Sequence, residues 1–354
     1  MTSPESEGPD AGGGPAGVES EPSASSGLTT APATPDVPPP ARPGVSTFTI
    51  EGRAAPGLFV VGWLAALAGL GALIVSVLAP PGAFKTILFI GSLVLLSIGL
   101  VAGAGAQGIE RRARGEAYRG PSPFLVFAAS IPTAVLLLVV LAIPLALVGI
   151  ELDGPVGRLL SVAGQAVIYA ALIRLLVVDV GALTWSGMGL VRPPSGPAAE
   201  LLRGAAWAVP VILLTIPVSA ILLQLFPVEP VSPLPPTGQV SGFLIQLVAG
   251  AVVAPMGEEL FFRGFATTAW VRSIGVSRGM VRAALFFAFV HVLTIEASSV
   301  GEGAQLALVG FATRIPVGLA LGWLFVRRGN IWAPLGLHAA FNGILLVIGE
   351  AAVR

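Results

Sequence analysis

The chain has 354 residues, of which 55% are hydrophobic and only 11% are charged, whereas an average soluble domain carries roughly 25% charged residues. A soluble protein of this composition would expose a surface that water solvates poorly. The composition therefore excludes an ordinary cytosolic enzyme and predicts a membrane-embedded chain that contacts the lipid bilayer. The 19 basic and 19 acidic residues cancel, so no nucleic acid partner is expected. Cysteine is absent, which excludes disulfides, thiolate nucleophiles and cysteine-ligated metals.

The N-terminal segment differs from the rest of the chain. Residues 1–50 are rich in Pro, Gly and Ser and carry more acidic than basic side chains. Such a segment has too little apolar surface to offset the entropy of ordering. It also lacks the basic start and short apolar run of a secretory signal. We expect a disordered cytoplasmic extension here.

Long apolar runs follow this extension. Four contain no charged residue over 21 to 27 positions, namely 57–79, 86–106, 124–150 and 204–226. Each is long enough to cross a hydrocarbon core of about 30 Å as a helix. The weaker runs are 156–178, 240–257, 280–295, 303–326 and 329–349. The sequence therefore predicts an all-α fold: a polytopic membrane helix bundle of about nine transmembrane helices, of which the first four occupy residues 56–180.

The arginine distribution predicts the orientation of these helices. With the N-terminus inside, the inner segments hold most of the arginines: Arg42, Arg53, Arg111, Arg112, Arg114, Arg119, Arg192, Arg203, Arg263, Arg272, Arg278, Arg282, Arg327 and Arg328. The outer segments hold only Lys85 and Arg354, with Arg158 at one border. This asymmetry follows the positive-inside rule. We expect the N-terminus inside, the C-terminus outside, and a multi-pass protein of a bacterial cell membrane.

Few ionisable residues fall within the predicted spans. Each costs roughly 2.5–3.5 kcal/mol on insertion scales, so those present are candidates for function. Both histidines of the chain, His291 and His338, lie in predicted spans, and the adjacent pair Glu258-Glu259 closes the run 240–257. We expect these groups to line one cavity that opens to the cytoplasmic half of the bilayer.

The acidic pair begins the segment Glu258 to Arg263. On a helix, Glu259 and Arg263 are i,i+4 neighbours on one face and form an ion pair. Glu258 lies about 100° round the helix, without a local partner, and is free to act on a water molecule. Two carboxylates in different environments are typical of acid/base catalysis. A routine salt bridge at a helix end is the structural alternative.

The two histidines stand in recurring local patterns. His291 follows Phe287 by one turn on the same helix face, and His338 and Asn342 are also i,i+4 neighbours. A single histidine on an apolar helix is most often a core residue bonded to a carbonyl. A histidine and an amide on one face can instead bind a water, bind a metal or donate hydrogen bonds to an oxyanion.

Taken in order, these motifs resemble a known family, the CPBP (Abi) intramembrane proteases, which include the type II CAAX prenyl endopeptidases. The family motifs E-E-x-x-x-R, F-x-x-x-H and H-x-x-x-N read here as Glu258-Glu259 with Arg263, Phe287 with His291, and His338 with Asn342. Segments 183–193 and 327–334 are also similar to the family pattern. The resemblance predicts an intramembrane protease core over residues 183–350.

The resemblance implies hydrolysis of peptide bonds in membrane-associated protein or peptide substrates, with prenylated CAAX proteins as the best-known substrate type. Glu258 would then activate the water, while Glu259 and Arg263 would hold the site together. His291 would position the water or the leaving group. His338 and Asn342 would stabilise the tetrahedral oxyanion.

Whether the site uses a metal is left open by the sequence. A glutamate-activated water needs no cofactor, and this is the expected arrangement. Glu258, His291 and His338 would otherwise form a His₂Glu zinc site, as in zinc hydrolases. Glu259 would then have to be the base while paired with Arg263. The H-E-x-x-H zinc motif is absent.

Two other classes of protein compete with the protease. A proton-coupled transporter would spread ionisable groups along a path through the membrane. Here they cluster, and only Arg314, in the middle of the run 303–326, fits such a path. A catalytically silent membrane scaffold or immunity protein would keep the fold without the chemistry. The intact Glu258, His291 and His338 favour the enzyme.

Overall fold

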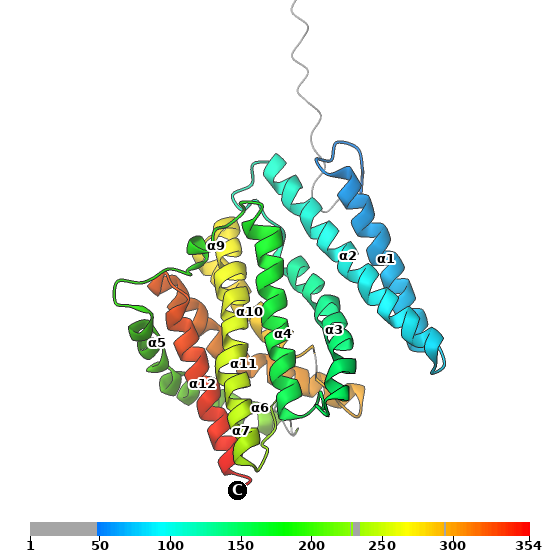
Figure 1. Cartoon of the computed structure of the whole chain (residues 1–354). Coiled ribbons are helices and arrows are strands. Elements are labelled where there is room, and N and C mark those ends of the chain that lie inside the picture. The colour runs from blue at the N-terminus through cyan, green and yellow to red at the C-terminus, as the bar shows by residue number, and fades with distance from the viewer. Residues whose placement is uncertain (1–47, 227, 229–233, 294) are drawn as a thin grey trace, which may run out of the picture. The chain divides into compact units, whose positions relative to one another are not determined.

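The computed structural model describes residues 48–226, 228, 234–293 and 295–354. All but the last three residues of the predicted extension 1–50 lie outside these described residues. Every regular element in the described part of the chain is a helix, as the sequence predicts (Figure 1).

The N-terminal part contains four long helices: α1 (Pro56–Leu78), α2 (Ala83–Ala113), α3 (Pro123–Leu147) and α4 (Pro155–Ile173), the last extended by the π-helical turn η1 (Arg174–Val178). Helices α1, α3 and α4 each have proline at their first position, where its missing N–H costs no helix hydrogen bond. In Figure 1, α1 and α2 run side by side as a hairpin, followed by α3 and α4.

Glycine permits the close approach of α1 and α2. A Cβ atom added to Gly99 would lie 2.4 Å from the backbone nitrogen of Ala66, and one added to Gly69 would lie 2.7 Å from that of Leu96. No side chain fits at such distances. Small residues that let backbones meet are the usual means of packing helices in lipid, where no hydrophobic force drives helices together.

The C-terminal part carries the remaining elements. They are η2 (Ser186–Met188), α5 (Pro197–Ala205), α6 (Ala208–Leu225), α7 (Val240–Val248), η3 (Ala249–Val253), α8 (Ala254–Glu258), η4 (Glu259–Thr267), α9 (Thr268–Ile274), α10 (Val276–Val290), α11 (Val300–Arg328) and α12 (Trp332–Ala351). Both η3 and η4 are π-helical. The helix α10 packs on α11, and α5 packs on α12.

In the described part of the chain, eight helical stretches are long and apolar enough to cross a membrane. This agrees with the prediction of about nine and makes the chain a multi-pass integral membrane protein. The predicted run 280–295 corresponds to α10, which has only 15 residues. A helix of that length spans about 22 Å, less than the hydrocarbon core of about 30 Å. The side on which the C-terminus lies depends on α10 and stays a prediction.

The prediction that a helix ends at Glu258 is wrong. One continuous helical stretch of 35 residues runs from Val240 to Ile274, and Glu258 lies near its middle. The stretch continues because the charge of Glu259 is neutralised within it and because apolar residues follow, among them Phe261, which is fully buried.

A cluster of aromatic rings joins this stretch to α10. Phe262 contacts Phe287 with ring centroids 5.3 Å apart, and Trp270 contacts Phe286 at 5.6 Å. Both pairs meet edge to face, which adds about 0.5–1.5 kcal/mol per pair beyond the area they bury. The cluster therefore holds η4 and α10 in fixed register, and these two elements carry Glu259 and His291.

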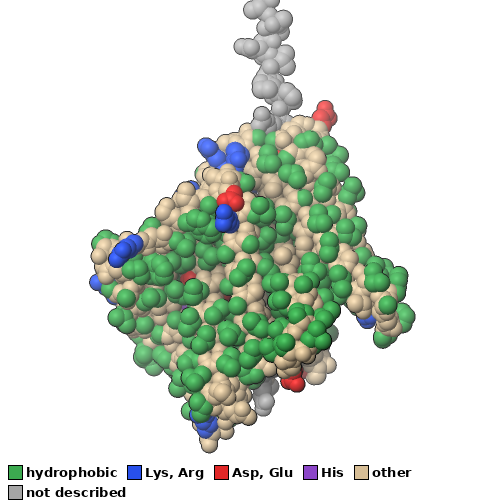
Figure 2. All heavy atoms as spheres, viewed as in Figure 1, with side chains coloured by type: hydrophobic (Ala, Val, Ile, Leu, Met, Phe, Trp, Pro, Cys, Tyr) green, Lys and Arg blue, Asp and Glu red, His purple; other side chains and the backbone are tan. Residues whose placement is uncertain are grey.

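The outer surface matches a lipid environment. Figure 2 shows hydrophobic side chains over most of the visible face, with few charged side chains, mostly near its edges. Large apolar residues such as Leu67, Leu147 and Leu213 are more than half exposed. A soluble monomer rarely exposes so large an apolar area, whereas a membrane protein covers it with acyl chains.

The loop between α2 and α3 tests the predicted orientation. Ala117 is exposed in this loop, and the chain has no native cysteine. We expect Ala117→Cys in intact cells to resist a membrane-impermeant thiol reagent and to react once the cells are opened, because Arg111, Arg112 and Arg114 favour the inner side. If Ala117→Cys is labelled from outside, the loop faces outward and the predicted orientation is wrong.

Candidate active site

Six side chains singled out in the sequence come from three places in the fold. Glu258, Glu259 and Arg263 lie on α8 and η4, His291 follows the last residue of α10, and His338 and Asn342 lie on α12. His291 is thus at the end of its helix, not inside it as predicted. In the structure α10 packs on η4, and α12 packs on α8.

The most deeply buried part of the site is an ion pair with a histidine attached. Glu259 Oε1 lies 2.9 Å from Arg263 Nη1 and accepts a hydrogen bond of 2.7 Å from His338 Nδ1. The side chains of Glu259, Arg263 and His338 are 0%, 2% and 4% exposed. Charges so far from water are stable only when they are paired. The Arg263 guanidinium also covers the Phe287 ring, 4.3 Å from its centroid.

Glu258 lies next to this ion pair but is more exposed than either of its members. Its Oε2 lies 3.5 Å from His291 Nε2 and 3.6 Å from His338 Nε2. The side chains of Glu258 and His291 are each 24% exposed, so both are accessible where Glu259 is not. Glu258 and Glu259 are adjacent in sequence and yet occupy different environments, as two carboxylates with different roles require.

Hydrogen bonding determines which ring nitrogens of the histidines carry protons. His291 Nδ1 donates to the Phe287 carbonyl at 2.7 Å, a free acceptor because α10 ends at Val290. His338 Nδ1 donates to Glu259. In their neutral forms both rings therefore present a bare Nε2 towards Glu258. Three acceptor atoms converge, and their spacing leaves room for a group that donates hydrogens.

Asn342 is held by an irregular piece of helix. Its Nδ2 donates to the Gly250 carbonyl at 2.9 Å, and Gly250 lies in the π-helical turn η3. A π-helical turn widens the helix and exposes carbonyl groups, and such turns are frequent at functional sites. Sequence patterns do not predict this contact, because π-helical turns have no simple sequence signature.

Comparison with known families bears on this arrangement. Residues 240–344 match the model of a family described as type II CAAX prenyl endopeptidase Rce1-like. The matched segment contains every one of the six residues and all three motifs. Over these residues the chain is similar to the Rce1-like endopeptidase family. No curated protein and no solved structure matches the chain.

The Rce1-like segment is braced by residues outside it. Glu200 on α5 is buried and accepts hydrogen bonds from Arg328 Nε at 2.8 Å and Nη2 at 2.5 Å, and from Asn330. Asn330 Oδ1 in turn accepts from the backbone N–H groups of Trp332 and Ala333 at the start of α12. Sequence reasoning did not single out Glu200, whose acidic side chain near an arginine carries no distinctive motif.

A second contact fixes the same end of α12. The indole of Trp332 donates to the Val191 carbonyl at 2.7 Å, and the Ile331 N–H donates to the Gly189 carbonyl at 3.0 Å. Gly189 has φ of 82°, a left-handed conformation that favours glycine. The two segments that resemble the family pattern, 183–193 and 327–334, thus meet each other. They position the Rce1-like segment's His338, two turns into α12.

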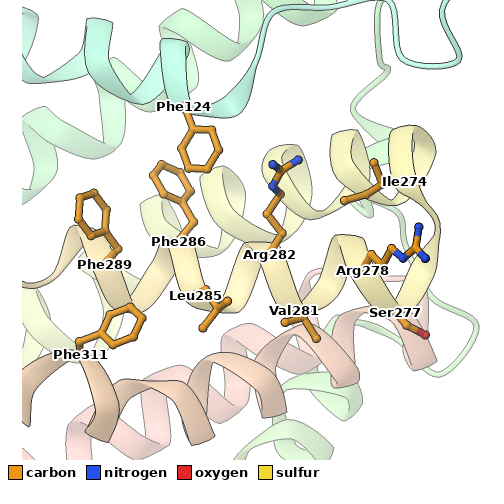
Figure 3. Close-up of a pocket in the computed structure, with 10 residues that line it drawn as sticks. All are labelled: Phe124, Ile274, Ser277, Arg278, Val281, Arg282, Leu285, Phe286, Phe289 and Phe311. Atoms are coloured by element: carbon orange, nitrogen blue, oxygen red, sulfur yellow. The ribbon is translucent and has the colours of Figure 1, made fainter. Parts of the chain in front are cut away.

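A groove runs along a different face of α10 in the Rce1-like segment. It has a volume of about 710 Å³. Figure 3 shows phenylalanine rings at one end and two arginines towards the other, with lining residues that include Phe124, Phe286, Phe289, Phe311, Arg278 and Arg282. Phe287 and His291, which face the catalytic groups, do not line it. The groove is therefore separate from the candidate active site.

Proposed function

We propose that this protein is an intramembrane endopeptidase that hydrolyses peptide bonds of membrane-associated proteins with a water activated by Glu258. The observation that carries the proposal is the convergence of Glu258 Oε2 with the Nε2 atoms of His291 and His338, at 3.5 and 3.6 Å. The similarity of residues 240–344, which include these three residues, to an endopeptidase family supports the proposal.

A water molecule bound at these atoms can donate to two of the three acceptors at a time. It donates to acceptors that would otherwise face one another, and a separation of about 3.5 Å or more between polar atoms often indicates such a bridge. When a substrate carbonyl approaches, Glu258 takes a proton from the water, and the hydroxide attacks the carbonyl carbon. As the C–N bond breaks, this proton reaches the leaving amine by way of His291 Nε2.

Charge balance supports the division of roles. Glu258 and Glu259 bring two negative charges, and Arg263 neutralises one. Glu258 is therefore left without an arginine ion-pair partner, and it is the carboxylate proposed to act on the water. Glu259 orients His338 through Nδ1, as the carboxylate of a serine protease triad orients its histidine.

The oxyanion is assigned to His338 and Asn342. One N–H of the Asn342 amide is held by Gly250, and the other stays free to donate. His338 Nε2 carries no hydrogen in the neutral ring and becomes a donor when the proton that Glu258 took from the water passes on to it. Both groups then stabilise charge that develops only in the transition state.

Asn342→Ala tests this assignment. We expect kcat to fall about 10²–10³-fold, because one oxyanion donor is lost, while KM stays nearly unchanged. Loss of the hydrogen bond to Gly250 costs only about 0.5–1.5 kcal/mol of stability, so thermal unfolding in detergent serves as the control for folding. An Asn342→Ala variant with full kcat would remove Asn342 from the mechanism.

A zinc site is the alternative reading of the same atoms. Both Nε2 atoms face Glu258 while each Nδ1 is held by an acceptor, the usual surroundings of zinc-bound histidine. However, no group of three such side chains in the described residues has metal-binding geometry, and we derive no step through a metal. Elemental analysis of the wild type and His338→Ala decides the matter: stoichiometric zinc that is lost in His338→Ala would replace the metal-free mechanism.

The substrate proposed from the family is a membrane-anchored protein of the prenylated CAAX type, cut in a bacterial cell membrane. Membrane proteomes of cells with the wild type and with Glu258→Ala test this directly. We expect shortened proteins that appear only with the wild type. Identical proteomes would favour the catalytically silent scaffold.

A further inference from the structure

Arg314 is a charged residue that the proposed mechanism does not use. It lies at the midpoint of α11 (Val300–Arg328). Its Nη1 donates to the Gly310 carbonyl of the same helix at 2.9 Å. No carboxylate among the described residues lies within ion-pair distance of it, although the buried Arg263 has Glu259. An arginine at the middle of a membrane span is costly, and such residues commonly mark a substrate pathway.

The Arg314 guanidinium lies beside the candidate active site. A Cβ atom added to Gly310 would lie 3.2 Å from Arg314 Nη1 and 3.3 Å from Val292 Cγ1. Val292 directly follows His291. The cation is thus at the end of α10 that carries His291, and its side chain is only half-buried.

We propose that Arg314 binds the terminal α-carboxylate of the peptide substrate. The inference rests on the proposed endopeptidase function and assigns a specificity-determining residue to it. With Nη1 bonded to Gly310, Arg314 retains further N–H groups in the planar arrangement that matches a carboxylate. A substrate anion would also supply the partner that Arg314 lacks within the described chain.

The first experiment compares two forms of one peptide. A prenylated Cys-aliphatic-aliphatic-X peptide is offered to the wild type in detergent micelles, once with a free C-terminal carboxylate and once as the amide. We expect KM to be about 10–100-fold lower for the free acid, as for other charge-assisted hydrogen bonds. In Arg314→Gln the two peptides should have equal KM, with kcat little changed. Arg314→Lys should restore part of the preference.

Two further variants test whether the preference depends on the position of the Arg314 guanidinium or only on the presence of positive charge on α11. Gly310→Ala keeps the arginine but crowds its guanidinium, so it should weaken the preference for the free acid. Arg327→Gln removes an arginine at the end of the same helix, where it covers Trp323, and should behave as the wild type. A preference that persists in Arg314→Gln would overturn the proposal. The proposal would also be overturned if the activity lost in Arg314→Gln depended on the anionic phospholipid content of the micelle and was the same for the free acid and the amide.

A binding measurement keeps this inference distinct from the proposed function. An aliphatic tripeptide with a free carboxylate should raise the unfolding temperature of the wild type and leave Arg314→Gln unchanged, and its amide should have no effect on either. If the wild type cleaves neither peptide but shows this Arg314-dependent stabilisation, the proposed function is wrong and the carboxylate site stands. Cleavage of acid and amide with equal KM overturns the carboxylate site alone. If the wild type shows no cleavage of either peptide and no stabilisation by the tripeptide, both the proposed function and the carboxylate site are wrong.

Discussion

Glu258→Gln is expected to abolish detectable turnover while the protein still folds. The substitution keeps the size of the side chain and removes the proton acceptor for the water, and a general base typically contributes about 10²–10⁴-fold to the rate. Glu258 is 24% exposed, and the groups nearest its Oε2 are the Nε2 atoms of His291 and His338, not an arginine. Loss of its charge therefore leaves no buried cation without a partner. The measurement is kcat on a cleaved peptide, or product formation in membranes.

The control for Glu258→Gln is its unfolding temperature in detergent, which should stay close to that of the wild type. Arg327→Gln serves as a matched substitution of a charged residue away from the site. A Glu258→Gln variant with kcat within tenfold of the wild type would show that another group takes the proton, and the proposed mechanism would fail.

Glu259→Gln is expected to lower stability as well as activity. Arg263 is 2% exposed, and Glu259 is its ion-pair partner. Removal of one member of a buried pair leaves an uncompensated charge and typically costs about 3–5 kcal/mol. Unlike Glu258→Gln, this variant should unfold at a clearly lower temperature. Equal unfolding temperatures for the two glutamine variants would contradict the division of roles.

A double variant separates the lost charge pair from the lost side chain. Glu259→Gln combined with Arg263→Met removes both charges, and apolar replacements of a buried pair are often neutral or stabilising. The double variant should therefore recover part of the stability lost in Glu259→Gln, without recovering activity, because His338 keeps only a neutral acceptor at Nδ1. A double variant less stable than Glu259→Gln would show that the charge of Glu259 is balanced elsewhere.

Hydropathy and local spacing predicted much of this molecule. Runs such as 57–79 and 124–150 became α1 and α3, since helix is the structure that satisfies its own backbone hydrogen bonds in lipid. Local spacing also predicted the ion pair of Glu259 with Arg263, because residues four positions apart on a helix are neighbours in any tertiary context. The motifs also predicted the family that residues 240–344 match.

Other features depend on contacts between residues far apart in sequence. Local spacing predicted that Glu258 has no partner on its own helix, and it does not reveal that two histidines from α10 and α12 approach it. His338 and Glu259 are 79 positions apart, and their hydrogen bond exists because Glu200 and Trp332 fix the start of α12. Periodicity carries no information on such pairs.

In membrane proteins the sequence predicts the helices much better than it predicts the contacts between them. Lipid is as apolar as leucine, so hydropathy indicates where a helix lies in the chain but not which of its faces meets another helix. The sequence alone determined the helical class, the spans and the residue types available for catalysis. The tertiary structure decided that the helix through Glu258 continues to Ile274 and that a π-helical turn presents Gly250 to Asn342. It also decided that Arg314 and Val292, the residue after His291, both lie next to Gly310. Those outcomes depend on side-chain packing between helices, where a shift of one residue moves each polar group to a different face.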